Sequence, residues 1–145
     1  MSGERVHILL VEDNHADVYL FRKALEAAEL NFQLTALEDG ASAIAFVRGE
    51  AEYAGCSLPD LIVLDLNVPK YDGGQVLRAI KSTERFAHVP VVIASSLPRL
   101  NLAEHERLTV ARFVHKPFSL DEFLNIGVTL KEVLLETHRL APRSC

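Results

Sequence analysis

The chain has 145 residues, of which 49% are hydrophobic and 24% charged, and its formal net charge at pH 7 is −5. This length predicts one domain with a full core, and the composition is that of a soluble globular protein. The negative charge argues against direct binding to nucleic acid, whose phosphates attract basic surfaces. The sequence has no apolar run of about 18 residues and no basic-then-apolar leader, so we expect no membrane span, no secretion and a cytoplasmic location.

The cysteines and histidines do not suggest a metal site. Cys56 falls in an expected loop and Cys145 at the terminus. A disulfide between them is one alternative, but two free thiols fit a reducing cytosol better. The six histidines form no HxH, HExxH or CxxC-type cluster, so zinc is not expected.

Five strand patterns alternate with helical patterns along the chain. The expected strands are residues 8–11, 32–36, 61–65, 91–95 and 112–115. Four of them contain continuous apolar runs, which are typical of central strands covered on both sides. The second alternates apolar and polar residues, as a strand near a sheet edge does.

Helix signals follow the strands. Asn14 is the expected N-cap of the first helix, with Asp17 three residues on. Ser119 and Glu122 form an S-x-x-E capping box that opens a long final helix. The other helices are expected from Asp39 to Val47, around residues 76–80 after a capping signal at Asp72 and Gln75, and, with the least regular apolar pattern, at 98–109.

This alternation with short connections predicts an α/β fold: a doubly wound, five-stranded parallel sheet with helices on both faces. In such sheets ligands bind beyond the carboxyl ends of the strands, where the strand order switches. In the flavodoxin-like order 2-1-3-4-5, which we expect here, the switch lies between the strands that end at Asp13 and Asp65. We expect residues 1–145 to form a single domain, with no linker, repeat or output domain.

Polar residues stand at the carboxyl ends of the four apolar strands. They are Glu12 and Asp13, Asp65, Ser95 and Lys116. Each one alone has an ordinary explanation as a loop residue, a helix cap or a solvated lysine. Their coincidence at matching strand ends favours a shared site instead. Three close carboxylates repel one another unless a cation joins them, and oxygen ligands suit Mg2+.

We therefore expect Mg2+ bound directly by Asp13 and Asp65, with Asn67 offering its main-chain oxygen and Glu12 holding a metal-bound water. Asp65 can then act as a nucleophile and form an aspartyl phosphate. The ammonium group of Lys116 suits one phosphoryl oxygen, and the Ser95 hydroxyl can donate to another.

The chain resembles the receiver domain of response regulators. The matching segments are residues 9–14, 60–69 with Asp72-Gly73, 90–96 and 113–118. The resemblance implies a two-component phosphorelay in which a sensor histidine kinase phosphorylates Asp65. It also assigns Glu12 and Asp13 as the acidic pair, Ser95 as the switch hydroxyl, Lys116 as the phosphoryl-binding lysine and Phe113 as the switch aromatic residue.

Finer features resemble the single-domain regulators paired with bacterial phytochrome-type kinases. They are Glu12-Asp13-Asn14-x-x-Asp17, Asp65-Leu66-Asn67-Val68-Pro69-Lys70 and the longer loop before Pro59. Two features depart from the family pattern. Leu97-Pro98 stands where a regular helix is expected, and Phe113 lacks the hydroxyl of a switch tyrosine.

The resemblance suggests a two-state switch. Phosphorylation adds about −1.5 to −2 charge, Ser95 would move toward the phosphoryl group, and Phe113 would turn inward. The alternative is that Phe113 is simply a core residue.

The last helix carries an apolar face for the sheet and further apolar residues at intervals of seven, namely Ile126, Val133 and Leu140. Because a second stripe needs a partner or more core, we expect a homodimer through this helix. A monomer with a frayed helix end is the alternative.

Two other function classes compete with a phospho-accepting signalling module. A Mg2+-dependent phosphatase with an aspartyl-phosphate intermediate favours a second acid two residues after its nucleophile, and here that residue is Asn67. An inert docking module would not need the acids, Ser95 and Lys116 together. We therefore expect no enzyme activity beyond the protein's own phosphorylation and dephosphorylation.

Overall fold

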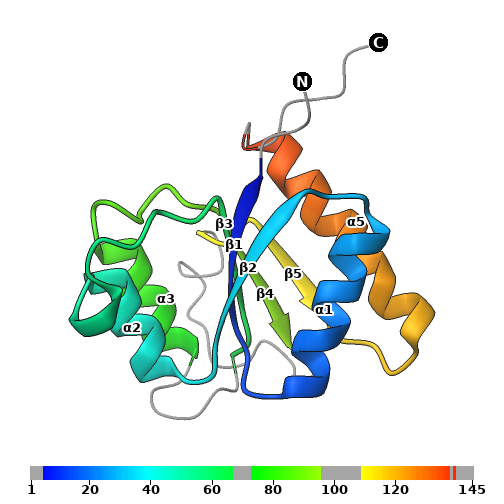
Figure 1. Cartoon of the computed structure of the whole chain (residues 1–145), viewed down its shortest axis with the longest axis horizontal. Coiled ribbons are helices and arrows are strands. Elements are labelled where there is room, and N and C mark those ends of the chain that lie inside the picture. Colours follow the sequence, from blue (N-terminus) through cyan, green and yellow to red (C-terminus); the bar gives the residue numbers. More distant parts are fainter. Residues whose placement is uncertain (1–4, 67–72, 96–108, 138, 140–145) are drawn as a thin grey trace.

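The computed structural model describes residues 5–66, 73–95, 109–137 and 139. Its strands form one parallel five-stranded sheet in the order β2-β1-β3-β4-β5 (Figure 1). The strands are β1 (Val6–Val11), β2 (Phe32–Leu37), β3 (Leu61–Leu64), β4 (Val91–Ser95) and β5 (Arg112–His115). The helices are α1 (His15–Ala27), α2 (Gly40–Arg48), α3 (Gly73–Ser82) and α5 (Leu120–Glu136), with a 3-10 turn at Ala51–Tyr53. The expected flavodoxin-like sheet and its strand order are confirmed.

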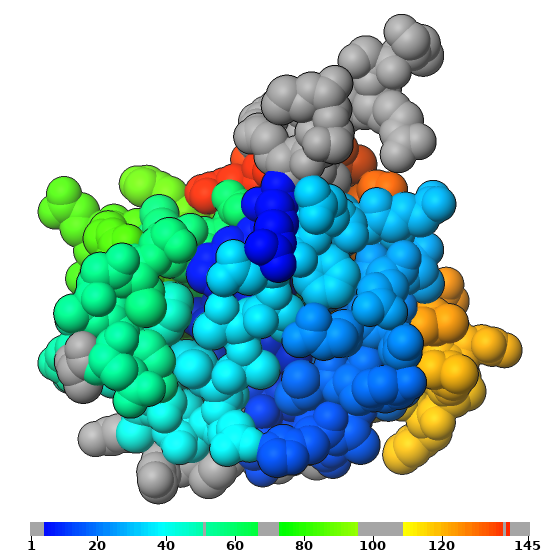
Figure 2. All heavy atoms as spheres, viewed as in Figure 1, coloured from blue at the N-terminus to red at the C-terminus, as the bar shows by residue number. Residues whose placement is uncertain are grey.

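Helices cover both faces of the sheet (Figure 1). Leu9 and Val11 of β1 belong to a core with α2 and α3, whereas Ile8 and Leu10 belong to a core with α1 and α5. Successive residues of a strand point to opposite faces, so one apolar run supplies both cores. In the space-filling view, α1 in blue and α5 in orange lie together on one side of the molecule (Figure 2).

The helix caps follow the sequence signals. The side chain of Asn14 accepts hydrogen bonds from the backbone at the start of α1, and Asp39 does the same for α2. Ser119 Oγ accepts a hydrogen bond from Glu122 N at 3.2 Å at the start of α5. The expected helix at 98–109 and the capping residue Asp72 fall on residues outside the described part of the chain.

The expectation that residues 112–115 form a central strand was wrong. In the described sheet β5 pairs with β4 alone, and Phe113 and Val114 are only half-buried. By contrast, every residue of β3 and β4 is buried. Two adjacent apolar residues are too short a signal to distinguish an edge strand from a central one.

The expected second apolar stripe on the last helix is not a free surface. Ile126 and Val133 are buried in the same core as Phe123 and Leu130, and Leu140 lies outside the described residues. Helix α5 packs on the sheet and also along α1, so a wide arc of its surface is covered. The intervals of seven reflect this second intramolecular contact.

The α1–α5 contact is close at Gly127. A Cβ atom added there would lie 2.1 Å from the carbonyl oxygen of Ala24, so the two helix backbones approach each other at this point. The rings of Phe21 and Phe123 meet edge to face with centroids 5.0 Å apart. Lys131 Nζ donates to the carbonyl oxygen of Ala28 at 3.0 Å, where α1 ends and has no basic residue of its own.

No helix in the described residues is long and apolar enough to cross a membrane.

Gly127→Ala should lower the free energy of unfolding by about 1–3 kcal/mol, because the added methyl group overpacks the helix contact. Helix propensity alone would change stability in the opposite direction, by about 1 kcal/mol. Urea denaturation measures the sign. Asn125→Ala, at an exposed position of the same helix, is the control and should have a small effect. A stabilised Gly127→Ala variant would contradict the close contact.

Candidate functional site

The sheet register brings the expected site residues to one edge. Val11 lies opposite Leu64 of β3, so Glu12 and Asp65 follow neighbouring strands at the same level. Asp65 N donates to the carbonyl oxygen of Val11 at 3.1 Å. Lys116 N donates to the carbonyl oxygen of Ser95 at 3.0 Å, which joins the end of β5 to the end of β4. Backbone hydrogen bonds thus fix where these side chains begin.

Three carboxylates meet at this edge. One oxygen each of Glu12, Asp13 and Asp65 lies within 4.8 Å of the others. Glu12 and Asp65 are only 1% and 6% exposed, whereas Asp13 is exposed. Two acids of the cluster are therefore buried at the carboxyl ends of the strands, and the third, Asp13, is open to solvent.

Lys116 joins the cluster from β5 and is itself buried. Its Nζ lies 2.6 Å from Glu12 Oε1, 2.9 Å from Asp65 Oδ2 and 2.9 Å from Asp17 Oδ2. An ammonium group has three N–H donors, so these three carboxylates occupy all of them. The charge of Lys116 is thus held directly beside Asp65.

Burial and the neighbouring Asp65 charge raise the pKa of Glu12 from 4.5 to about 7, although hydrogen bonding to Lys116 opposes them. Burial by itself lowers the pKa of Lys116, but the three carboxylates more than offset burial and raise that pKa above its ordinary value. Lys116 is therefore charged at neutral pH. Glu12 has a pKa near neutral pH mainly because it is buried, and the neighbouring Asp65 charge adds to that effect.

The donor set fits a hard divalent cation. Glu12, Asp17 and Asp65 contact one lysine, and Asp13 lies beside Glu12 and Asp65, so the acids of the site outnumber its lysine. Oxygen ligands at these spacings suit Mg2+ or Mn2+ better than softer metals. Asn67, the expected main-chain ligand, lies outside the described residues.

Asp17 is the site residue that sequence reasoning missed. Its position three residues after Asn14 made it a helix-capping candidate, yet its carboxylate is directed to Lys116. The available signal was the spacing: an acid one helical turn beyond an acidic pair stays on the side of the sheet edge where that pair lies.

The two switch candidates lie on neighbouring strands, β4 and β5. Ser95 is the last residue of β4 and is buried. Phe113 on β5 is half-buried and packs against the core shared with α2 and α3. The Phe113 ring is therefore already partly inserted into the core in this structure.

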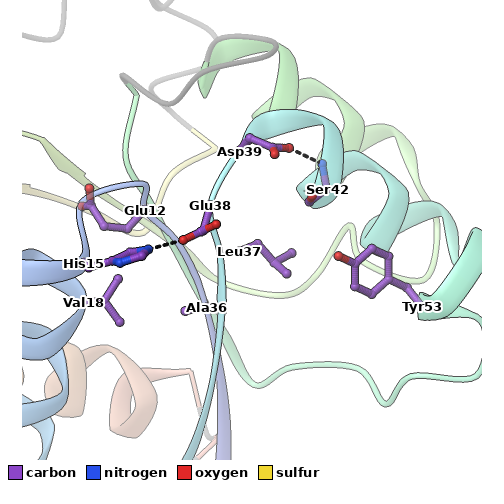
Figure 3. Close-up of a pocket in the computed structure, with 9 residues that line it drawn as sticks. All are labelled: Glu12, His15, Val18, Ala36, Leu37, Glu38, Asp39, Ser42 and Tyr53. Atoms are coloured by element: carbon purple, nitrogen blue, oxygen red, sulfur yellow. Dashed lines mark hydrogen bonds and ion pairs between the residues drawn. The ribbon is translucent and has the colours of Figure 1, made fainter.

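A cavity of about 380 Å³ adjoins the acid cluster (Figure 3). Glu12 and His15 lie on one side of it, and Ser42 and Tyr53 lie on the other. His15 forms an ion pair with Glu38, and this hydrogen bond raises the pKa of His15. Glu12 borders this cavity between the first turns of α1 and α2, although it is itself only 1% exposed.

Sequence comparison agrees with the fold. Residues 8–126 match the family model of the response regulator receiver domain. Response regulator Rcp1 of Synechocystis sp. is 42% identical over 132 residues, which cover 90% of this chain and 89% of Rcp1.

Two solved structures extend the comparison. The crystal structure of the phosphorylated cyanobacterial phytochrome response regulator RcpA is 35% identical with a TM-score of 0.79, covering 96% of this chain and all of RcpA's. The Mn(2+)-bound form of Rcp1 is 32% identical with a TM-score of 0.76, covering 91% of this chain and 96% of the other.

A parallel sheet whose strand ends carry an acid cluster and a buried lysine defines a class of phosphoryl-accepting signalling domains. The chain belongs to the response regulator receiver domain family, and it is homologous to the phytochrome response regulators Rcp1 and RcpA.

The raised pKa of Glu12 gives a pH dependence to the stability of the metal-free protein. The folded protein holds this proton up to about pH 7, whereas the ordinary pKa is 4.5, so Glu12 makes stability fall as the pH rises between these values. With a chelator present, Glu12→Gln should remove this contribution. The measurement is urea denaturation of both proteins at about pH 5 and about pH 8. Parallel pH dependences would show that Glu12 does not titrate in this range.

Proposed function

We propose that this protein is a response regulator that accepts a phosphoryl group on Asp65 from the phosphohistidine of a sensor histidine kinase. One observation carries the proposal: the buried carboxylate of Asp65, the residue after β3, lies 2.9 Å from the Lys116 ammonium group and within reach of two further acids. This arrangement puts a nucleophile beside both a cation-binding set and a fixed positive charge.

In the proposed reaction a carboxylate oxygen of Asp65 attacks the phosphorus atom. The bond from phosphorus to the imidazole nitrogen breaks with its electron pair staying on that nitrogen, and a proton from water converts the leaving ring to neutral imidazole. Lys116 binds one phosphoryl oxygen, and Ser95 donates its hydroxyl to another. Mg2+ supplies neutralising charge when bound, held by Asp13, Asp65 and the main-chain oxygen of Asn67, with Glu12 on a metal-bound water.

The relatives support the donor and the cofactor. RcpA is described as a phosphorylated phytochrome response regulator, and Rcp1 has been solved with Mn(2+) bound. We extend both properties to this chain: a phytochrome-type histidine kinase as donor and Mg2+ as the cation. We also propose that this exchange takes place in the cytoplasm, because the kinase would draw its phosphoryl group from ATP.

The protein's chemistry in this proposal is limited to its own phosphorylation and dephosphorylation. A phosphatase acting on outside substrates would favour a second acid two residues after Asp65 as its proton donor, and the chain has Asn67 there. The output is instead a change of surface: Ser95 moves toward the phosphoryl group and Phe113 turns further inward. This alters β5 and its surroundings.

We propose a homodimer through α5. Ile126 and Val133 are buried in the core, so the contact would use other residues of this helix. Leu120, Val128 and Leu135 are exposed apolar residues of α5, and the latter two are separated by seven positions. They lie on the solvent side of the helix and are available to a second copy.

Sedimentation equilibrium tests this dimer at protein concentrations of tens of micromolar. Val128→Glu combined with Leu135→Glu should yield monomers, because charges at a buried apolar contact are costly. A wild-type protein that stays monomeric with and without acetyl phosphate would contradict the dimer.

The phosphorylation site is tested with acetyl phosphate and intact mass. We expect one phosphoryl group per wild-type chain, dependent on Mg2+, and none on Asp65→Asn, which lacks the nucleophilic oxygen. Asp121→Asn, an exposed acid in the first turn of α5, is the control and should react as wild type does. A phosphoryl group that persists on Asp65→Asn would move the acceptor elsewhere. Its absence from the wild-type protein would favour a docking module.

A further inference from the structure

Asp17 is the one acid of the site that the proposed chemistry does not use. It lies on α1, its side chain is 23% exposed, and its Oδ2 accepts a hydrogen bond from Lys116 Nζ at 2.9 Å. It is not among the three acids whose oxygens gather for a cation. Its charge is therefore directed at the lysine alone.

The local structure explains why Asp17 is free to reach Lys116. In a capping box, the acid three residues after the N-cap accepts a hydrogen bond from the backbone N–H of the cap. Here that N–H, on Asn14, donates to Glu12 Oε2 at 3.2 Å. Glu12 therefore accepts the hydrogen bond that Asp17 would accept in a capping box. The Asp17 carboxylate forms an ion pair with Lys116 instead.

The three carboxylates on Lys116 differ in what the proposed reaction asks of them. Glu12 belongs to the cation set, and Asp65 gives up a carboxylate oxygen when it becomes an acyl phosphate. In the proposed reaction Asp17 neither binds the cation nor forms a covalent bond, so it can remain paired with Lys116. A lysine side chain is a flexible four-carbon chain, so its position beside the reacting atoms depends on such a partner.

We propose that Asp17 is a positioning residue that holds Lys116 Nζ beside Asp65 during phosphoryl transfer. This inference rests on the proposed function. Its physical basis is that a small displacement of a charged group from the reacting atoms costs a large factor in rate.

The first test is the rate of phosphorylation by acetyl phosphate at saturating Mg2+, which removes any effect of Asp17 on cation affinity. Asp17→Asn and Asp17→Ser should each react about tenfold more slowly than wild type. Asp121→Asn makes the same charge change in the first turn of α5, away from the three carboxylates that contact Lys116, and should keep the wild-type rate. Saturation of the protein with Mg2+ is established by calorimetry, because the chain has no tryptophan whose fluorescence could report cation binding.

Two further readouts separate positioning from a general effect on α1. In a Lys116→Ala background, Asp17→Asn should cause no further loss of rate, since Asp17 acts through the lysine. In chelator, without any reaction, the effects of Asp17→Asn and Lys116→Met on the free energy of unfolding should be non-additive. Additive effects in either measurement would overturn the inference.

The outcomes also separate this inference from the proposed function. A wild-type adduct together with an unchanged or faster rate in Asp17→Asn overturns the positioning role and leaves the phosphoryl acceptor in place. A faster rate would mean that Asp17 competes with the phosphoryl group for Lys116. A wild-type protein with no adduct overturns the proposed function, and the positioning role falls with it.

Discussion

The ion pairs of Lys116 are the constraint on which the site depends. Its ammonium group joins acids from the ends of β1 and β3 and from the first turn of α1, and it is buried with two of them. Removing one partner of such a pair leaves a buried charge uncompensated, at a cost of about 3–5 kcal/mol. The lysine therefore stabilises the acids at the sheet edge as well as presenting a positive charge to Asp65.

The parallel sheet explains how residues 104 positions apart meet. All five strands run in the same direction, so their carboxyl ends share one edge. Strands β3 and β4 are buried on both faces, and Asp65 and Ser95 at their carboxyl ends are buried too. Helices α1 and α2 then border the edge, and their first turns leave the adjoining cavity open (Figure 3).

The sequence predicted the features that depend on local pattern. Buried strands, the caps at Asn14 and Ser119, and the convergence of Asp65 and Lys116 follow from periodicity and from the rule for strand ends. It did not predict features that depend on which element packs against which. Val133 appeared to need a partner outside the chain because a tertiary contact such as α1–α5 leaves no local pattern. Asp17 appeared to be a helix cap because Lys116 lies 99 residues away in the sequence.

The charge of the site implies an order of events in the proposed reaction. Four carboxylates and one lysine carry a net charge of −3 when all are ionised, and burial together with the neighbouring Asp65 charge raises the pKa of Glu12 to about 7. A phosphoryl group carries about −1.5 to −2 and would enter such a site against strong repulsion. A divalent cation removes most of the excess, so cation binding should precede phosphoryl transfer. Lys116, held by Asp17, then supplies a second positive charge beside Asp65.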